Sequence, residues 1–78
     1  MIELNKFIEK ISDQFVEPDN QNIELDTEYQ KLDTWDSLTS MAIIAIIDDE
    51  FGVVIAEDDL VNSQTIIELF NLVNRKSR

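Results

Sequence analysis

The sequence predicts an all-α fold: a small four-helix bundle with three main helices, one short helix and a long loop between the first two helices. Apolar residues recur at helical spacing near the N-terminus. A second apolar run, at residues 41–47, lies between a capping residue and a glycine. The chain has 78 residues with one proline and one glycine. This length suits a single domain spanning residues 1–78.

The first helix is expected at about residues 2–16. Its apolar stripe is Leu4, Phe7, Ile8, Ile11 and Phe15. Pro18 ends the helix, because a residue that precedes proline avoids the helical conformation. Residues 17–35 then form a loop with a short helical turn near residues 28–31. The isolated apolar residues of this loop are interpreted as anchors on the core: Ile23, Leu25, Tyr29 and Leu32.

The second helix is expected from Ser37 to about Glu50, with Asp36 as its N-cap and Gly52 as its stop. Helical spacing from Phe51 predicts that Ile47, Ile44, Ile43 and either Ser40 or Met41 face the core. The opposite stripe is Leu38, Ala42, Ala45 and Asp49, with Ile46 beside it. A small bundle cannot enclose both faces of one helix, so the outer stripe is interpreted as a docking surface, with Asp48 and Asp49 at its charged end. Extra core is the alternative, mainly for Ile46.

Two shorter segments complete the bundle. Residues 53–55 are expected to pack inward, and residues 57–61 form one short helical turn with Leu60 in the core. Thr65 and Glu68 match a capping box, in which Glu68 reaches back to the Thr65 N–H. The last helix then runs from Ile66 to about Asn74. Its apolar stripe is Ile66, Leu69, Phe70 and Val73.

Composition excludes several classes of function. The chain has neither cysteine nor histidine, so thiolate metal sites, cysteine nucleophiles and the commonest general base are missing. We therefore expect no metal site and no enzyme. Seventeen acidic residues face six basic ones, which disfavours nucleic acid and anionic membranes and favours basic protein partners. A solvated surface is the simpler alternative. With no signal or membrane-spanning segment, a monomeric cytoplasmic protein is expected.

Ser37 is the candidate site. Its hydroxyl would stand at the start of the second helix, where backbone N–H groups favour an anion, so Ser37 suits the attachment of a phosphate-linked group. The site lies within Asp36-Ser37-Leu38, ahead of the apolar helix that closes in residues 48–52. With the acidic turn at residues 57–59 and the terminal residues 65–69, this pattern resembles the acyl carrier proteins over essentially the whole chain.

The resemblance implies a four-helix bundle that carries acyl groups as thioesters on a 4′-phosphopantetheine arm. A phosphopantetheinyl transferase would move the arm from coenzyme A onto Ser37, supported by Asp36. Leu38 would be the first hydrophobic contact for acyl-loading ligases or synthases, and Asp48 and Asp49 would meet their basic residues. A short acyl chain could lie between the helices among five residues: Ile44, Ile47, Val54, Ile55 and Phe70.

Two departures from fatty-acid carriers favour a specialised, polyketide-like pathway over a housekeeping one. Trp35 stands where a small residue is common, and Ala42 stands where an acid is frequent. Trp35 would pack over the loop or face partners. An aminoacyl or peptidyl carrier stays open as an alternative, although the glycine-rich lead typical of peptidyl carriers is missing. A non-carrier acidic adaptor protein is the second alternative, and it would not depend on Ser37.

Overall fold

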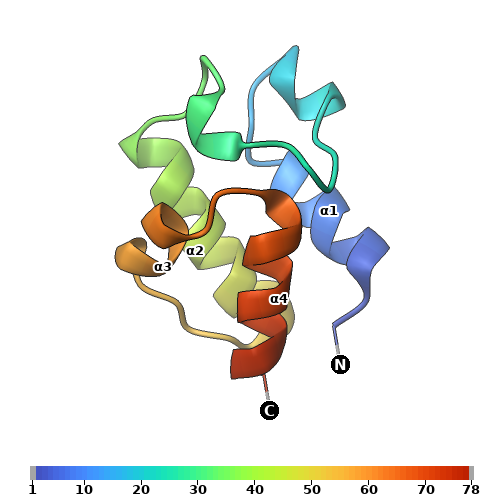
Figure 1. Cartoon of the computed structure of the whole chain (residues 1–78), viewed down its shortest axis with the longest axis vertical. Helices are drawn as coiled ribbons and strands as arrows, with labels where there is room; N and C mark the ends of the chain where they lie inside the picture. The colour runs from blue at the N-terminus through green and yellow to red at the C-terminus, as the bar shows by residue number, and fades with distance from the viewer. Residues whose placement is uncertain (1, 78) are drawn as a thin grey trace.

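The computed structural model describes residues 2–77, which form helices and turns and contain no strand. The main helices are α1 (Leu4–Ser12), α2 (Ser37–Phe51) and α4 (Ile66–Lys76), and α3 (Glu57–Asn62) is short. Two 3₁₀ turns, η1 (Asp19–Gln21) and η2 (Tyr29–Lys31), lie in the long loop between α1 and α2. The loop covers one end of the bundle, and α3 lies beside α2 (Figure 1). The predicted fold class is confirmed.

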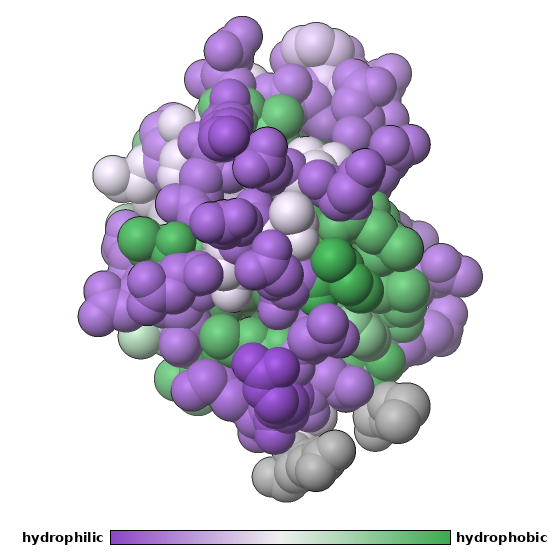
Figure 2. All heavy atoms as spheres, viewed as in Figure 1, coloured by the Kyte–Doolittle hydropathy of each residue, from purple (hydrophilic) through white to green (hydrophobic). Residues whose placement is uncertain are grey.

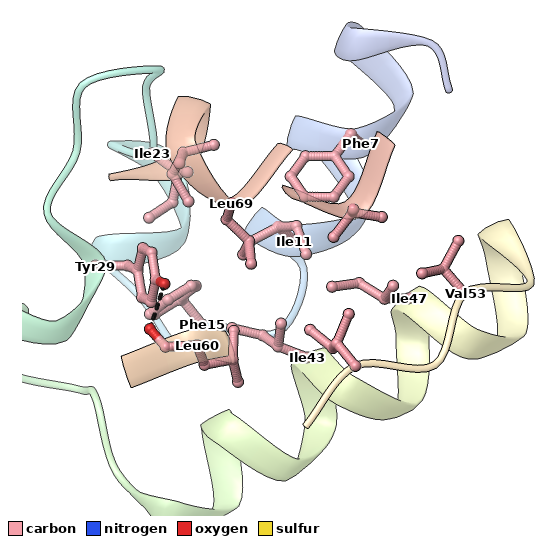
Figure 3. Packing of buried hydrophobic residues seen from close by; sticks show 13 residues of the cluster. Phe7, Ile11, Phe15, Ile23, Tyr29, Ile43, Ile47, Val53, Leu60 and Leu69 are labelled. Carbon is pink, nitrogen blue, oxygen red and sulfur yellow. Dashed lines mark hydrogen bonds between the residues drawn. The ribbon is translucent and has the colours of Figure 1, made fainter. Parts of the chain in front are cut away.

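Each helix contributes buried side chains to one core (Figure 3). Eight side chains from the four helices have no exposed surface: Phe7, Ile11, Ile43, Ile47, Leu60, Ile66, Leu69 and Val73. Phe70 is half-buried and places its ring edge-on against Phe7, with centroids 5.3 Å apart. On the face shown in Figure 2, most exposed side chains are hydrophilic, and an apolar area lies over α1 and α4.

The prediction for α1 was too long, because the helix ends at Ser12 instead of about residue 16. The backbone then tightens, with the N–H groups of Gln14 and Phe15 bonding to carbonyls three residues back. This tighter turn still buries Phe15, which is only 3% exposed. The apolar spacing therefore predicted correctly which side chains are buried, but the helix predicted from it was too long.

The anchors of the long loop are mostly as predicted. Tyr29 is fully buried, Ile23 nearly so, and Leu32 packs against the core. The predicted turn near residues 28–31 is confirmed as η2. The prediction that Leu25 anchors the loop on the core was wrong, because its side chain is 39% exposed. That residue holds the loop through its carbonyl oxygen, which accepts the Ile67 N–H at 2.9 Å.

In the segment after α2, successive side chains point in opposite directions. Val53 and Ile55 are buried, but Val54 is 74% exposed, so residues 53–55 do not all pack inward. The predicted acyl-lining role of Val54 is therefore wrong. The α4 helix extends to Lys76, two residues beyond the predicted end. Thr65 caps it as predicted, but Glu68 binds the Thr65 hydroxyl at 3.1 Å rather than its backbone N–H.

Candidate functional site at the start of α2

Asp36 and Ser37 form the N-terminal boundary of α2. The Asp36 backbone is extended, and its Oδ1 accepts the Thr39 N–H at 2.8 Å. This is the predicted N-cap, which satisfies one of the backbone donors that a helix start leaves without a partner. Ser37 is consequently the first helical residue, and its side chain is exposed. The cap fixes the backbone direction at the serine while leaving the hydroxyl accessible.

The loop before Ser37 is held in place by the core. The Trp35 ring packs against Tyr29 and Phe15, with centroid separations of 5.2 and 6.2 Å. Thr34 donates from its hydroxyl to Asp19 Oδ2 at 2.7 Å, and its carbonyl accepts the Thr39 hydroxyl at 3.3 Å. Trp35 therefore packs over the loop, and it anchors the chain two residues ahead of the serine.

The predicted inner face of α2 is largely confirmed. Ser40, Ile43 and Ile47 are buried, which resolves the choice between Ser40 and Met41. Met41 is instead 62% exposed, and Ile44 and Phe51 are half-buried. Helical phase explains this, because Ser40, Ile43 and Ile47 share one face while Met41 is rotated away from it.

The outer stripe of α2 lies on the surface beside Ser37. Leu38 is 76% exposed, and Ala45, Asp48 and Asp49 are exposed as well. Ala42 is half-buried and lines an open depression of about 400 Å³, together with Val16, Leu38 and residues of the loop. The structure thus brings the predicted partner-binding residues together on one side of α2, with Ala42 at the margin.

A comparison with family models decides the family. The model described as phosphopantetheine attachment site matches residues 5–73. The chain belongs to this family. No curated protein and no solved structure gave a significant match. The family match includes Asp36, Ser37 and the whole of α2 and α3.

Members of this family carry a covalently attached 4′-phosphopantetheine arm, so the chain is a phosphopantetheine-carrying carrier protein. The geometry at Ser37 fits such a group. Its side chain is exposed at the first position of a fifteen-residue helix, whose N-terminus favours a negatively charged phosphodiester. The arm supplies the thiol on which a carrier holds its cargo, and the chain itself has no cysteine.

The acidic groups along α2 differ in their surroundings. The Thr39 N–H, which bonds to the Asp36 carboxylate, lowers the pKa of Asp36 below its ordinary value. Glu50, at the far end of α2, lies 3.8 and 3.7 Å from the ammonium groups of Lys6 and Lys10 on α1. Within residues 2–77, Asp48 and Asp49 form no ion pair, so their charges face solvent beside the outer stripe.

Two exposed apolar residues of α2 and α3 were missed from the sequence. Met41 was counted as a possible core residue, and Val61 of α3, which is 54% exposed, was not assigned a role. The helical phase of α2 centred on Ile43 and Ile47 would have found Met41. No sequence signal placed Val61, because its exposure depends on how α3 packs beside α2.

Neither a membrane span nor a metal cluster is found in the part of the chain that the structure describes. None of its helices is long and apolar enough to cross a membrane. Over residues 2–77, no three carboxylate, histidine or cysteine side chains are grouped so that they could hold a metal ion.

Proposed function

We propose that this chain is an acyl carrier protein whose arm is attached to Ser37. The observation that supports the proposal is the position of Ser37, exposed and first in α2, inside a family match that spans residues 5–73. Acyl intermediates would be held as thioesters on the arm. The protein would take no catalytic part in the reactions, since no histidine or cysteine stands near Ser37 to activate it.

The neighbouring residues would assist loading in defined ways. Asp36 uses Oδ1 to cap α2, and its fully exposed carboxylate leaves Oδ2 for a magnesium ion brought by the transferase. The cap also keeps Ser37 at the helix terminus, where the attached phosphate is favoured. Asp36 would therefore support the serine both structurally and chemically.

The docking surface would comprise exposed side chains of α2, which begins at Ser37, and of the neighbouring α3: Leu38, Met41, Ala45, Asp48, Asp49 and Val61, with Ala42 at its margin. Its apolar centre and acidic end suit a phosphopantetheinyl transferase and acyl-loading ligases or synthases with basic docking surfaces. Net charge of −11 would steer such partners to a monomeric, cytoplasmic carrier.

An acyl cargo is favoured over an aminoacyl one, and a specialised pathway over general fatty-acid synthesis. Trp35 and Ala42 support the choice of pathway, because they replace the small and acidic residues common in fatty-acid carriers. Loading of the holo protein by an acyl ligase, compared with an adenylating aminoacyl ligase, would separate the two cargo classes. The aminoacyl or peptidyl carrier would then be recognised by its transfer of an amino acid.

The test of the attachment site is an intact-mass measurement. Wild type, Ser37→Ala and the control Ser77→Ala are each incubated with coenzyme A, magnesium and a broad-specificity phosphopantetheinyl transferase. We expect wild type and Ser77→Ala to gain one phosphopantetheine and Ser37→Ala to gain none while remaining folded. A gain by Ser37→Ala would move the site elsewhere, and no gain by folded wild type would favour an acidic adaptor protein.

A further inference from the structure

The C-terminal end of α3 has no cap from its own sequence. The last turn holds no basic residue, and Ser63, which follows the helix, has an extended backbone instead of the left-handed turn that a glycine would supply. The final carbonyl groups of a helix lack intrahelical partners and need donors from elsewhere. In α3 the Asp59 carbonyl accepts the N–H of Ser63, and the donors to the Leu60 and Val61 carbonyls come from a part of the chain about thirty residues earlier.

Two consecutive residues of η2 supply the missing donors. Tyr29 Oη lies 2.6 Å from the Leu60 carbonyl oxygen and 2.7 Å from that of Ser63. Gln30 Nε2 lies 3.1, 3.0 and 3.0 Å from the carbonyl oxygens of Leu60, Val61 and Ser63. One hydroxyl proton and two amide protons thus serve three carbonyl groups. Figure 3 shows the bond between Tyr29 and Leu60.

The donor side of this contact is rigid. Tyr29 is fully buried, and burial raises the pKa of its hydroxyl, so the hydroxyl stays protonated and able to donate. The loop is also bonded to α4, because the carbonyls of Leu25 and Thr27 accept the N–H groups of Ile67 and Ile66. The segment that leads into η2 is therefore bonded to α4, just ahead of Tyr29 and Gln30.

The rest of α3 is weakly attached. Leu60 is its one buried residue, and Asp59 forms an ion pair with Lys76 at 3.7 Å between partly exposed groups. Val61, which belongs to the docking surface, is bonded to Gln30 through its own carbonyl. The contact with η2 consequently fixes both the end of α3 and the backbone of a docking residue.

We propose that Tyr29 and Gln30 are positioning residues, which hold α3 and its Val61 beside α2 in the arrangement that partner enzymes recognise. The part that concerns partners rests on the proposed function. The part that concerns α3 rests on the hydrogen bonds alone. The two parts are tested by separate measurements on the apo protein.

The first measurement is amide hydrogen exchange of Gln30→Met and Tyr29→Phe, which remove donors and keep side-chain size. The matched control is Gln64→Met, because Gln64 is exposed and makes no side-chain hydrogen bond within residues 2–77. We expect exchange in α3 to rise about tenfold or more, with changes below about threefold in α2 and α4. Gln30→Lys should restore protection, because an ammonium donates well to a helix C-terminus.

The second measurement is the kinetics of arm transfer to Ser37. Gln30→Met should raise KM for the apo carrier by about threefold to tenfold while kcat stays within about twofold, since the chemistry at Ser37 is untouched. Gln64→Met should change neither. Unchanged exchange in α3 or equal acceleration in all helices would overturn the part that concerns α3, and an unchanged KM would overturn the part that concerns partners. Failure of the proposed function is distinguishable, because wild type itself would then gain no arm.

Discussion

At the scale of single residues, one carboxylate determines how Ser37, the proposed attachment residue, is presented. Asp36 begins α2 by accepting the Thr39 N–H, and the next residue is therefore helical and exposed. Because Asp36 itself is fully exposed, its contribution depends on the backbone bond and the helix dipole rather than on burial. The same bond is the main cause of the lowered pKa of Asp36.

This lowered pKa predicts a pH-dependent stability. A carboxylate whose pKa is lower in the folded state stabilises the protein above its unfolded pKa, about 3.9, and that contribution is lost as the pH falls toward the folded value. Wild type should therefore be more stable than Asp36→Ala at pH 6, and the gap should shrink at pH 3. Urea unfolding at both pH values measures the gap.

Asp33→Ala is the control for this comparison. Asp33 is exposed and its carboxylate accepts no hydrogen bond within residues 2–77. Replacing it should not reproduce the pH dependence of the Asp36 variant. An equal gap for Asp36→Ala at pH 6 and pH 3 would contradict the role assigned to the charged cap.

At the scale of elements, the ends of α2 were predictable and those of α1 were not. Asp36 and Gly52 are local stop signals, and they placed α2 within one residue of its observed end at Phe51. The end of α1 depends on where Phe15 must reach to enter the core, which no local residue encodes. The exposure of Val54 likewise depends on the extended backbone between two helices, where successive side chains point in opposite directions.

The residues of the candidate site divide in the same way, into those marked by local signals and those placed by tertiary contacts. Ser37, Asp36 and the outer stripe of α2 could be located from caps and helical phase within one helix. The caps on α3 could not, because Tyr29 and Gln30 lie about thirty residues away and no local pattern links them to Leu60. Tertiary hydrogen bonds of this kind can be identified only in the folded structure, where the position of the loop relative to α3 is known.

Gly52 offers a test of the C-terminal end of α2. Its φ of 67° lies in the left-handed region, and a Cβ added there would meet no atom within 4 Å. The cost of Gly52→Ala is therefore backbone strain alone, about 1 kcal/mol. Chemical denaturation should show this loss, and Gly52→Asn should lose less, because asparagine tolerates this conformation better. Equal stability of all three proteins would contradict the assigned backbone role.

A positive charge introduced on the outer stripe tests docking. Ala45 is exposed on α2, so Ala45→Arg should keep the helical circular-dichroism signal while repelling a basic partner. We expect KM for the transferase to rise about tenfold, equivalent to about 1.4 kcal/mol. Asn71→Arg adds the same charge on an exposed site of α4 and should have little effect. Equal KM values for both variants would discard the outer stripe as the docking surface.

At the scale of the whole molecule, the acidic excess acts on stability and on binding in opposite ways. Residues 48–59 hold six carboxylates and no basic residue. Within residues 2–77, three ion pairs offset part of this charge, two at Glu50 and one at Asp59, all between partly exposed groups. Exposed pairs contribute about 0–1 kcal/mol each, so repulsion among the remaining acids dominates the net electrostatic effect.

Salt should therefore stabilise the apo protein while weakening its encounters with partners. Raising the salt concentration from about 0.05 to about 0.5 M shortens the screening length well below 10 Å, which reduces repulsion within the protein and attraction to a basic enzyme. The melting temperature should rise, and KM for the transferase should rise as well. A melting temperature that falls or stays constant would show that the acids do not strain the folded chain.

The contact between η2 and α3 also orders the events of folding. A six-residue helix is too short to persist alone. The donors for its last carbonyls arrive only after the chain closes a loop of 30 to 34 residues. We expect α3 to form after α1, α2 and α4 have met, so that Tyr29 and Gln30 slow unfolding more than they speed folding. The α3 part of the proposed docking surface, which holds Val61, would then be the last to form and the first to open.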